Sequence, residues 1–173
     1  MPFGEYVPFD HLFRYITPLD IDFTPGMGQT LFNLNGMPPF SVLICFEDTK
    51  ASLAREAVLN GATWIINQTN DAWFDPSSQS EQHLAHAVFR CVENRVPMAR
   101  SCNTGVTAII DSFGRVERRL EPLKRGFLLG TVYPNNIKPC GTKYTEIGDV
   151  FSKIMILVAG CGFVFSGCIY RNK

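Results

Sequence analysis

Short apolar runs alternate with segments of helical spacing through the first hundred residues. Residues 40–44 (FSVLI) and 63–67 (TWIIN) have the length and composition of buried strands. Between these strands, residues 49–60 place Leu53, Ala57 and Val58 on one face of a helix that ends at Asn60-Gly61. This order predicts a strand, a helix and a second strand in the same sheet.

The remainder of this region predicts one longer helix and then several strands. The helix is expected from about residue 80 to residue 94, before Pro97, and Ser112-Phe113-Gly114 is expected to form a tight hairpin turn. Helix, strand and meander together predict one layered α/β domain over residues 1–146. The other expected elements are a helix at 11–17 and strands at 30–34, 98–102, 106–110, 116–120 and 127–132.

The C-terminal part of the chain has a different pattern. Residues 150–170 are almost entirely apolar, about the length that crosses a bilayer core of about 30 Å. We therefore expect a transmembrane helix within residues 147–173, with Arg171 and Lys173 in a short basic cytoplasmic tail. This orientation puts residues 1–146 outside the cytoplasmic membrane and requires an upstream membrane segment, because no signal peptide is predicted. The alternatives are a tail anchor with the domain facing the cytoplasm, or a buried terminal helix.

Composition narrows the function classes. The 16 basic and 16 acidic residues balance, and this lack of a basic surplus argues against a nucleic-acid partner. The six cysteines lack the spacing of a disulfide framework, and most are expected to be small core residues. His83 and His86 have no metal-ligand context and are expected on the helix surface or in packing, so no metal and no cofactor are predicted.

Cys45 has the setting of a nucleophile. It ends a buried strand and precedes a helix, where a helix N-terminus can lower a thiol pKa and backbone N–H groups can receive an oxyanion. A lone cysteine at a strand end is more often a core residue, but Glu47 and Asp48 follow Cys45 directly. A second polar cluster at residues 67–71 ends the next strand, and the ends of adjacent parallel strands converge on one cleft.

Five segments carry a family resemblance: GEYVP, ICFED, NQTNDAWF, QHLAHAVFR and ENRVPMARSCNTGVTAIIDSFGR. Together they resemble the apolipoprotein N-acyltransferases, bacterial membrane enzymes of the nitrilase superfamily. The resemblance implies an α/β fold, a partial nitrilase-like α-β-β-α sandwich followed by one C-terminal transmembrane helix. It also implies the bacterial inner membrane, with the catalytic domain on the periplasmic side.

The same resemblance implies a two-step reaction. Cys45 takes an acyl chain from a phospholipid donor, phosphatidylethanolamine, as a thioester, and passes it to the N-terminal diacylglyceryl-cysteine of a lipoprotein. Phe46 would supply a backbone N–H to the oxyanion. Glu5 matches a glutamate that supports the site, although it could be an ordinary surface carboxylate. Glu47 matches a glutamate needed near the nucleophile, or it is a structural ion-pair partner.

Two residues after the second strand are expected to contact substrate. Trp73 matches an aromatic residue important for activity and could line the acyl or headgroup path, although it could be a core tryptophan. Asn70 is assigned with it to substrate binding, although Asn70 and Asp71 could instead cap and shape the loop.

The family's glutamate base and oxyanion-stabilising lysine have no matching positions here. The chain alone is therefore expected to be inactive and to require a missing upstream half. Two alternatives remain open. One is a soluble nitrilase or amidase acting on C–N bonds, and the other is a catalytically silent membrane-anchored module.

Overall fold

The computed structural model describes residues 26–73, 77–135 and 141–171, and for residues 164–171 only the course of the helix. Glu5 and the helix expected at 11–17 lie outside the described residues. The elements in chain order are β1 (Leu31–Phe32), β2 (Phe40–Ile44), η1 (Cys45–Thr49), α2 (Ala51–Leu59), β3 (Trp64–Asn70), α3 (Gln79–Asn94), β4 (Met98–Asn103), β5 (Thr107–Ile110), β6 (Val116–Leu120), α4 (Lys143–Ile147) and α5 (Val150–Arg171).

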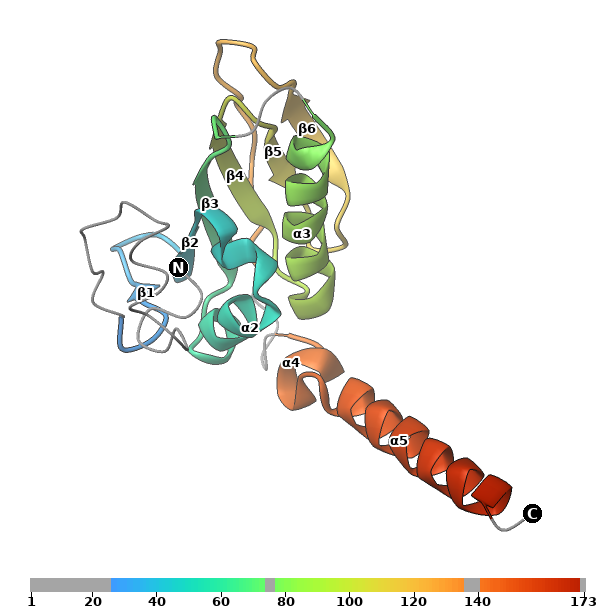
Figure 1. Ribbon diagram of the computed structural model, residues 1–173. Helices are drawn as coiled ribbons and strands as arrows, with labels where there is room; N and C mark the ends of the chain where they lie inside the picture. The colour runs from blue at the N-terminus through green and yellow to red at the C-terminus, as the bar shows by residue number, and fades with distance from the viewer. Residues whose placement is uncertain (1–25, 74–76, 136–140, 172–173) are drawn as a thin grey trace, which may run out of the picture.

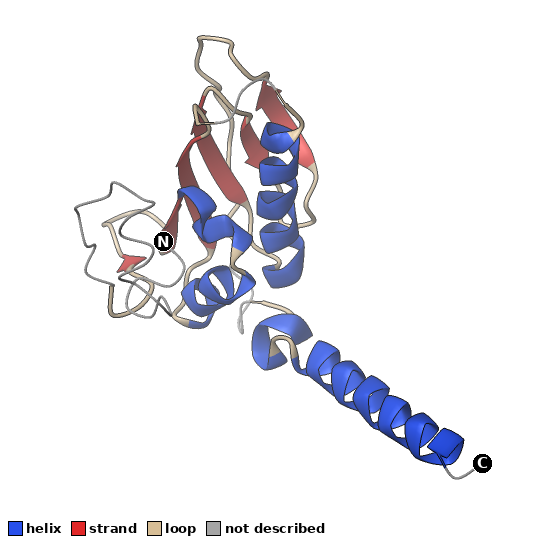
Figure 2. Ribbon diagram, in the orientation of Figure 1, coloured by secondary structure: helices blue, strands red, loops and turns tan. Residues whose placement is uncertain are grey.

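Six strands form one mixed sheet in the order β1-β2-β3-β4-β5-β6. The central strands β2, β3 and β4 run parallel, whereas β1 and the β4–β5–β6 meander are antiparallel. Parallel pairing follows from the helical crossovers, α2 between β2 and β3 and α3 between β3 and β4. Both helices cover the same face of the sheet (Figures 1 and 2). The predicted α/β order is confirmed.

The core lies between that face and the two helices. Alternate residues of the strands point into it, as period-two geometry requires. Residues Leu43, Ile65, Met98, Ala108 and Ile110 of the sheet meet Val58 of α2 and Leu84, Ala87 and Cys91 of α3.

One expected strand is absent from the described residues, and several elements have other bounds than predicted, such as β1 at Leu31–Phe32 and β3 at Trp64–Asn70. Residues 127–132 form no strand and do not pair with β6. The segment runs without regular structure to Asn135, whose backbone N–H donates to the Thr63 carbonyl at 3.0 Å. The helix expected from residue 49 begins at Ala51, and a 3₁₀ turn fills the space after Cys45.

A short helix, α4, precedes the apolar segment. Side chains from both covering helices fix it: Arg55 of α2 donates to the Glu146 carbonyl at 2.8 Å, and the Thr145 hydroxyl donates to Asn94 Oδ1 of α3 at 3.1 Å. From this anchored turn α5 projects away from the sheet (Figure 1), and its side chains at residues 150–163 are exposed.

Among the described residues, no helix combines the length and apolar character needed to cross a bilayer. The membrane span expected over residues 150–170 is therefore not confirmed.

Candidate active site

The site begins with the backbone of Cys45. This half-buried residue directly follows β2, opens η1 and has φ of 51°, in the left-handed region. That conformation costs a residue with a Cβ about 1–2 kcal/mol and persists only where the surroundings impose it. The predicted sharp turn after the strand is confirmed, and it turns the chain abruptly at the cysteine.

Glu47 closes this turn. Its Oε2 accepts a hydrogen bond from the backbone N–H of Ile44 at 2.8 Å, and the Thr49 hydroxyl donates to the Phe46 carbonyl at 2.7 Å. The structure thus places the Glu47 carboxylate beside the Cys45 turn, as a hydrogen-bond acceptor for a backbone N–H. Its role in catalysis stays a prediction.

Asn67 ties the turn to the neighbouring strand. Its amide Nδ2 donates to the carbonyls of Leu43 at 3.2 Å and Cys45 at 3.3 Å. Asn67 is fully buried in β3, level with Leu43 of β2 in the parallel register. A buried amide with fixed partners on two carbonyls fixes the direction of the chain as it leaves β2.

Beneath the turn lies a buried ionic cluster, formed by Asp48, Asp71, His83 and Arg100, each no more than 2 % exposed. His83 bridges the two carboxylates, with Nε2 2.9 Å from Asp48 Oδ1 and Nδ1 2.9 Å from Asp71 Oδ1. Arg100 Nη1 donates to Asp48 Oδ2 at 2.7 Å, and its Nη2 lies 3.6 Å from Asp71 Oδ2.

The ionic cluster is joined to the turn through Asn67. Arg100 Nη1 donates to Asn67 Oδ1 at 2.5 Å, which leaves the Asn67 amide group to donate to the backbone. Arg100 also donates from Nε to the Val106 carbonyl at 3.2 Å. Buried charges are tolerated when each is paired and hydrogen-bonded. Each of the four charged groups has an ionic partner, although Asp71 Oδ2 and Arg100 Nη2 lie 3.6 Å apart and have no hydrogen-bond partner among the described residues.

The expectation for His83 was therefore incomplete. It packs inside the protein but is a bridging residue of the ionic cluster, because the inward-facing side of α3 carries polar groups at this end. His86, one turn on, is exposed as expected for a helix-surface residue. Asp48, Asn67 and Arg100 were also missed as site residues. The sequence could have revealed them, because they are polar residues at positions that strand and helix periodicity assign to the core.

Hydrogen bonding governs the charge of His83. Burial lowers its pKa, but the hydrogen bond to Asp48, the Asp48 charge and the hydrogen bond to Asp71 outweigh burial and the opposing charge of Arg100. The net pKa lies above the usual 6.5. An imidazolium can donate from both ring nitrogens, which matches a ring with a carboxylate oxygen at each end.

Phe46 follows Cys45 and packs on this cluster. Its ring stacks on the His83 imidazole with centroids 4.6 Å apart and planes inclined by 11°. Because the side chain is held this way, the Cys45–Phe46 peptide is connected to His83 by packing as well as through Asp48. Donation of the Phe46 N–H to an oxyanion stays a prediction.

Asn70 and Trp73 lie at the surface. Asn70 Oδ1 accepts from the Ala72 backbone N–H at 3.1 Å and from Asn103 Nδ2 at 3.2 Å, so the loop-shaping interpretation is confirmed. Trp73 is 85 % exposed, which excludes the core interpretation. Their roles in substrate binding stay predictions.

Burial affects the thiols of two further cysteines, Cys91 and Cys102. Burial raises the pKa of Cys91, and burial together with the Asp71 charge raises the pKa of Cys102 to about 11. Thiols of raised pKa are poor nucleophiles near neutral pH. In the described ranges, no group of three or more histidine, cysteine or carboxylate side chains is arranged to hold a metal ion.

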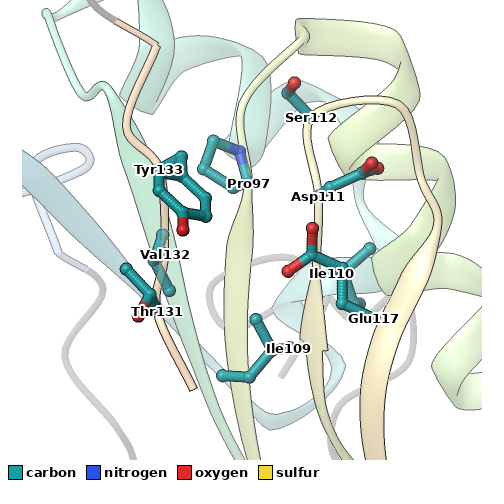
Figure 3. Close-up of a pocket in the computed structure, with 9 residues that line it drawn as sticks. All are labelled: Pro97, Ile109, Ile110, Asp111, Ser112, Glu117, Thr131, Val132 and Tyr133. Atoms are coloured by element: carbon teal, nitrogen blue, oxygen red, sulfur yellow. The ribbon is translucent and has the colours of Figure 1, made fainter.

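Two hollows lie away from Cys45. One, of about 40 Å³, is lined by residues at the start of β4 and around the β5–β6 turn (Figure 3). It lies at the end of the sheet opposite the end of β2. The other, of about 940 Å³, opens on the sheet face that α2 and α3 leave uncovered, beside Ile66, Ser101 and Phe127. Neither hollow is lined by Cys45, Asn70 or Trp73.

Comparison with known proteins places this geometry in a family. The carbon-nitrogen hydrolase family model matches residues 4–141. Relatives named apolipoprotein N-acyltransferase include one from Geobacter metallireducens, 38% identical over 176 residues, which cover 100% of this chain and 32% of the relative. Apolipoprotein N-acyltransferase 1 of Treponema denticola is 35% identical over 183 residues, covering 100% of this chain and 33% of the relative.

The chain spans about a third of the length of these curated relatives. Among solved structures, an amidase from Nesterenkonia sp. AN1 aligns with 58% of this chain and 42% of its own, with a TM-score of 0.49 and 22% identity. The family match includes the strand, the turn with Cys45 and the whole ionic cluster. The chain belongs to the carbon-nitrogen hydrolase family, with a nitrilase-like α/β fold.

Proposed function

We propose that this chain carries the nucleophile of an apolipoprotein N-acyltransferase. It would move an acyl chain from phosphatidylethanolamine to the N-terminal diacylglyceryl-cysteine of a lipoprotein. Family membership and the names of relatives at 32–38% identity support this proposal. The observation that carries it is the left-handed turn at Cys45, fixed by Asn67 and Asp48 to buried charges.

The proposed chemistry has two balanced steps. The Cys45 thiol loses its proton, its sulfur attacks the ester carbonyl, and the C–O bond breaks to release a lysophospholipid that takes up a proton. The α-amino group of the lipoprotein then attacks the thioester, the C–S bond breaks, and an amide forms as the thiol is regenerated. Phe46 N–H is the proposed donor to the oxyanion in both steps.

Further groups are needed for the proton transfers. The resemblance assigns these to a glutamate and a lysine that match no position of this chain, and the chain covers about a third of its relatives. We therefore propose that an upstream half supplies both residues. Glu5 and Glu47 support the site, and Asn70 and Trp73 contact the lipid.

The proposed substrates place the protein at a membrane. We propose that residues 150–170 span the bacterial inner membrane and hold the domain on the periplasmic side. The apolar composition and the exposed side chains of residues 150–163 support this part of the proposal. Resistance of the chain to extraction from membranes by alkaline carbonate would test the span.

A second candidate is hydrolysis of C–N bonds, which the description of the matching family favours. In that case water, rather than a lipoprotein amine, would resolve an acyl-enzyme formed from an amide. Release of ammonia from simple amides, without acylation by phospholipid, would distinguish this candidate.

Labelling of Cys45 tests the main proposal. The chain is produced in membranes together with the upstream two thirds of the Geobacter metallireducens relative, and phosphatidylethanolamine with a radiolabelled acyl chain is added. We expect hydroxylamine-labile label on the peptide that contains Cys45. The chain without the upstream part should acquire none.

Two variants provide matched controls. Cys45→Ala should lose all label, whereas Cys161→Ala, which removes an exposed thiol of α5, should retain it. Circular dichroism establishes that each variant is folded. If the reconstituted pair and its Cys45→Ala variant are equally unlabelled, the catalytically silent interpretation holds and the proposal fails.

A further inference from the structure

His83 connects to the Cys45 turn by two direct contacts, with Asp48 and with Phe46, and the contact with Asp48 leads on to a third residue pair. Its Nε2 contacts Asp48, which lies in the same 3₁₀ turn as Cys45. Its ring stacks on Phe46. Through Asp48 it shares Arg100, which holds the Asn67 amide that donates to the Cys45 carbonyl.

We propose that His83 is a positioning residue for the Cys45–Phe46 peptide. As an imidazolium donating to both Asp48 and Asp71, it holds this peptide in the left-handed turn, with the thiol and the next backbone N–H directed to the same reacting carbonyl. This inference rests on the proposed acyl transfer and adds a residue to it. His83 does not contact the substrate, and its effect passes through Phe46 and Asp48.

Charge balance in the core gives the physical reason. With a protonated ring, two carboxylates face two cations, and the cluster carries no net charge. With a neutral ring, Asp48 and Asp71 face only Arg100, and a net negative charge remains buried, which is costly. The next cation along α3, Arg90, donates to the Asp48 backbone carbonyl at 3.2 Å and pairs with Glu93 at 2.7 Å. It contacts neither carboxylate of the cluster in the described structure.

Loss of the His83 proton should therefore loosen the turn. One carboxylate would lose its donor, so the ring would be held at one end only and would position Phe46 less firmly. A displacement of about 1 Å at a reacting group can lower a rate by about 100-fold. The consequence should be confined to η1, because the strands and α2 are held by the apolar core.

The test compares His83→Gln with His86→Gln in the 173-residue chain. Glutamine offers one donor end and one acceptor end, so it cannot donate to both carboxylates. Hydrogen exchange, read by mass spectrometry, reports opening of residues 45–49. We expect exchange there to be at least tenfold faster in His83→Gln than in the original chain, and unchanged in His86→Gln, which alters an exposed residue of the same helix.

Rescue separates positioning from general damage. In His83→Gln the ionic cluster has one excess negative charge, and adding Asp71→Asn removes it and supplies an amide donor for the glutamine oxygen. The double variant should restore slow exchange at residues 45–49 to within about threefold of the original chain. If His83→Gln does not fold, the double variant should still fold, and failure of both to fold would overturn the charge-balance argument.

Kinetics of the pair reconstituted with the upstream part provide a second readout. His83→Gln should lower kcat for thioester formation by about 10–100-fold and change KM for phosphatidylethanolamine less than twofold. Equal exchange and equal kcat in His83→Gln and His86→Gln would overturn the inference. If the original pair forms no thioester, the proposed function fails, while hydrogen exchange still decides whether His83 holds the turn.

Discussion

The region at the end of β3 and the region beneath the Cys45 turn differ in burial. Below it, Asp48, His83 and Arg100 are closed off from solvent, and each has at least two polar contacts. Asn70, the last residue of β3, and Trp73, in the loop that follows, are exposed, and Trp73 is 85 % accessible. The residues that family resemblance assigns to substrate therefore lie at the surface, and the residues that fix the Cys45 turn are buried.

This difference separates two kinds of polar residue. Exposed residues of the loop can change with little effect on folding, so their importance would be seen mainly in activity. Buried residues of the ionic cluster affect stability and activity together, because they hold both the core and the turn. Substitutions in the loop should therefore lower activity more than stability, whereas substitutions in the ionic cluster should lower both.

The largest loss of stability is expected for Arg100→Leu. Removal of this guanidinium leaves two buried carboxylates facing only His83, and loss of one partner of a buried ion pair costs about 3–5 kcal/mol. Urea unfolding followed by circular dichroism measures the change in the free energy of unfolding. Arg125→Leu, at an exposed arginine, is the matched control and should change it by less than about 0.5 kcal/mol. Similar losses in the two variants would contradict the role given to the cluster.

Gly105→Ala should have the next largest effect. A Cβ at this position would overlap the Asp71 carboxylate oxygen and lie 2.6 Å from Cys102 Sγ, so the cluster must shift. Overpacking of this kind costs about 1–3 kcal/mol. At Gly126 an added Cβ meets only Leu120, at 3.7 Å, so Gly126→Ala is the control. Equal unfolding free energies for the two variants would show that the cluster can shift to accommodate the added methyl group without loss of stability.

Strain at Cys45 predicts an increase in stability. Cys45→Gly removes the Cβ that opposes φ of 51° and should raise the free energy of unfolding by about 1 kcal/mol, whereas Cys45→Ala keeps the strain. Thermal or urea unfolding of the two variants measures the difference. If alanine and glycine are equally stable here, the left-handed turn is not strained.

Much of this arrangement follows from the sequence, and the exceptions have a common cause. The buried strands and α3 are apolar enough for their periodicity to define them, and the Cys45 turn follows from its place between two such segments. Residues 127–132 are also apolar, but among the residues that the structure describes no strand continues the sheet beyond β6. Periodicity shows that His83 and Arg100 face inward, but only the packing of α3 on β4 shows that they meet the same two carboxylates.

The pH dependence of stability should report His83. Its pKa is raised in the folded state, so its contribution is fully present below the usual value of 6.5 and is lost as pH rises through the folded value. The urea midpoint should therefore fall as pH rises above 6.5, and this component should be absent from His83→Gln and present in His86→Gln. A midpoint profile identical in all three proteins would contradict the bridged imidazolium.

Trp73→Ala should have the smallest effect on stability. The exposed indole contributes little to the core, so the free energy of unfolding should change by less than about 0.5 kcal/mol. If this side chain lines the lipid path, KM for phosphatidylethanolamine should rise in the reconstituted pair. An unchanged KM and kcat would remove Trp73 from the substrate site.

The acyl-enzyme itself tests the central claim most directly. Intact-protein mass spectrometry of the reconstituted pair, after incubation with phosphatidylethanolamine of defined acyl chains, should show one added acyl group that maps to Cys45 and is removed by hydroxylamine. Addition of a diacylglyceryl-cysteine peptide should transfer that group to the peptide amine. An unmodified Cys45 in a folded, membrane-bound pair would contradict the account.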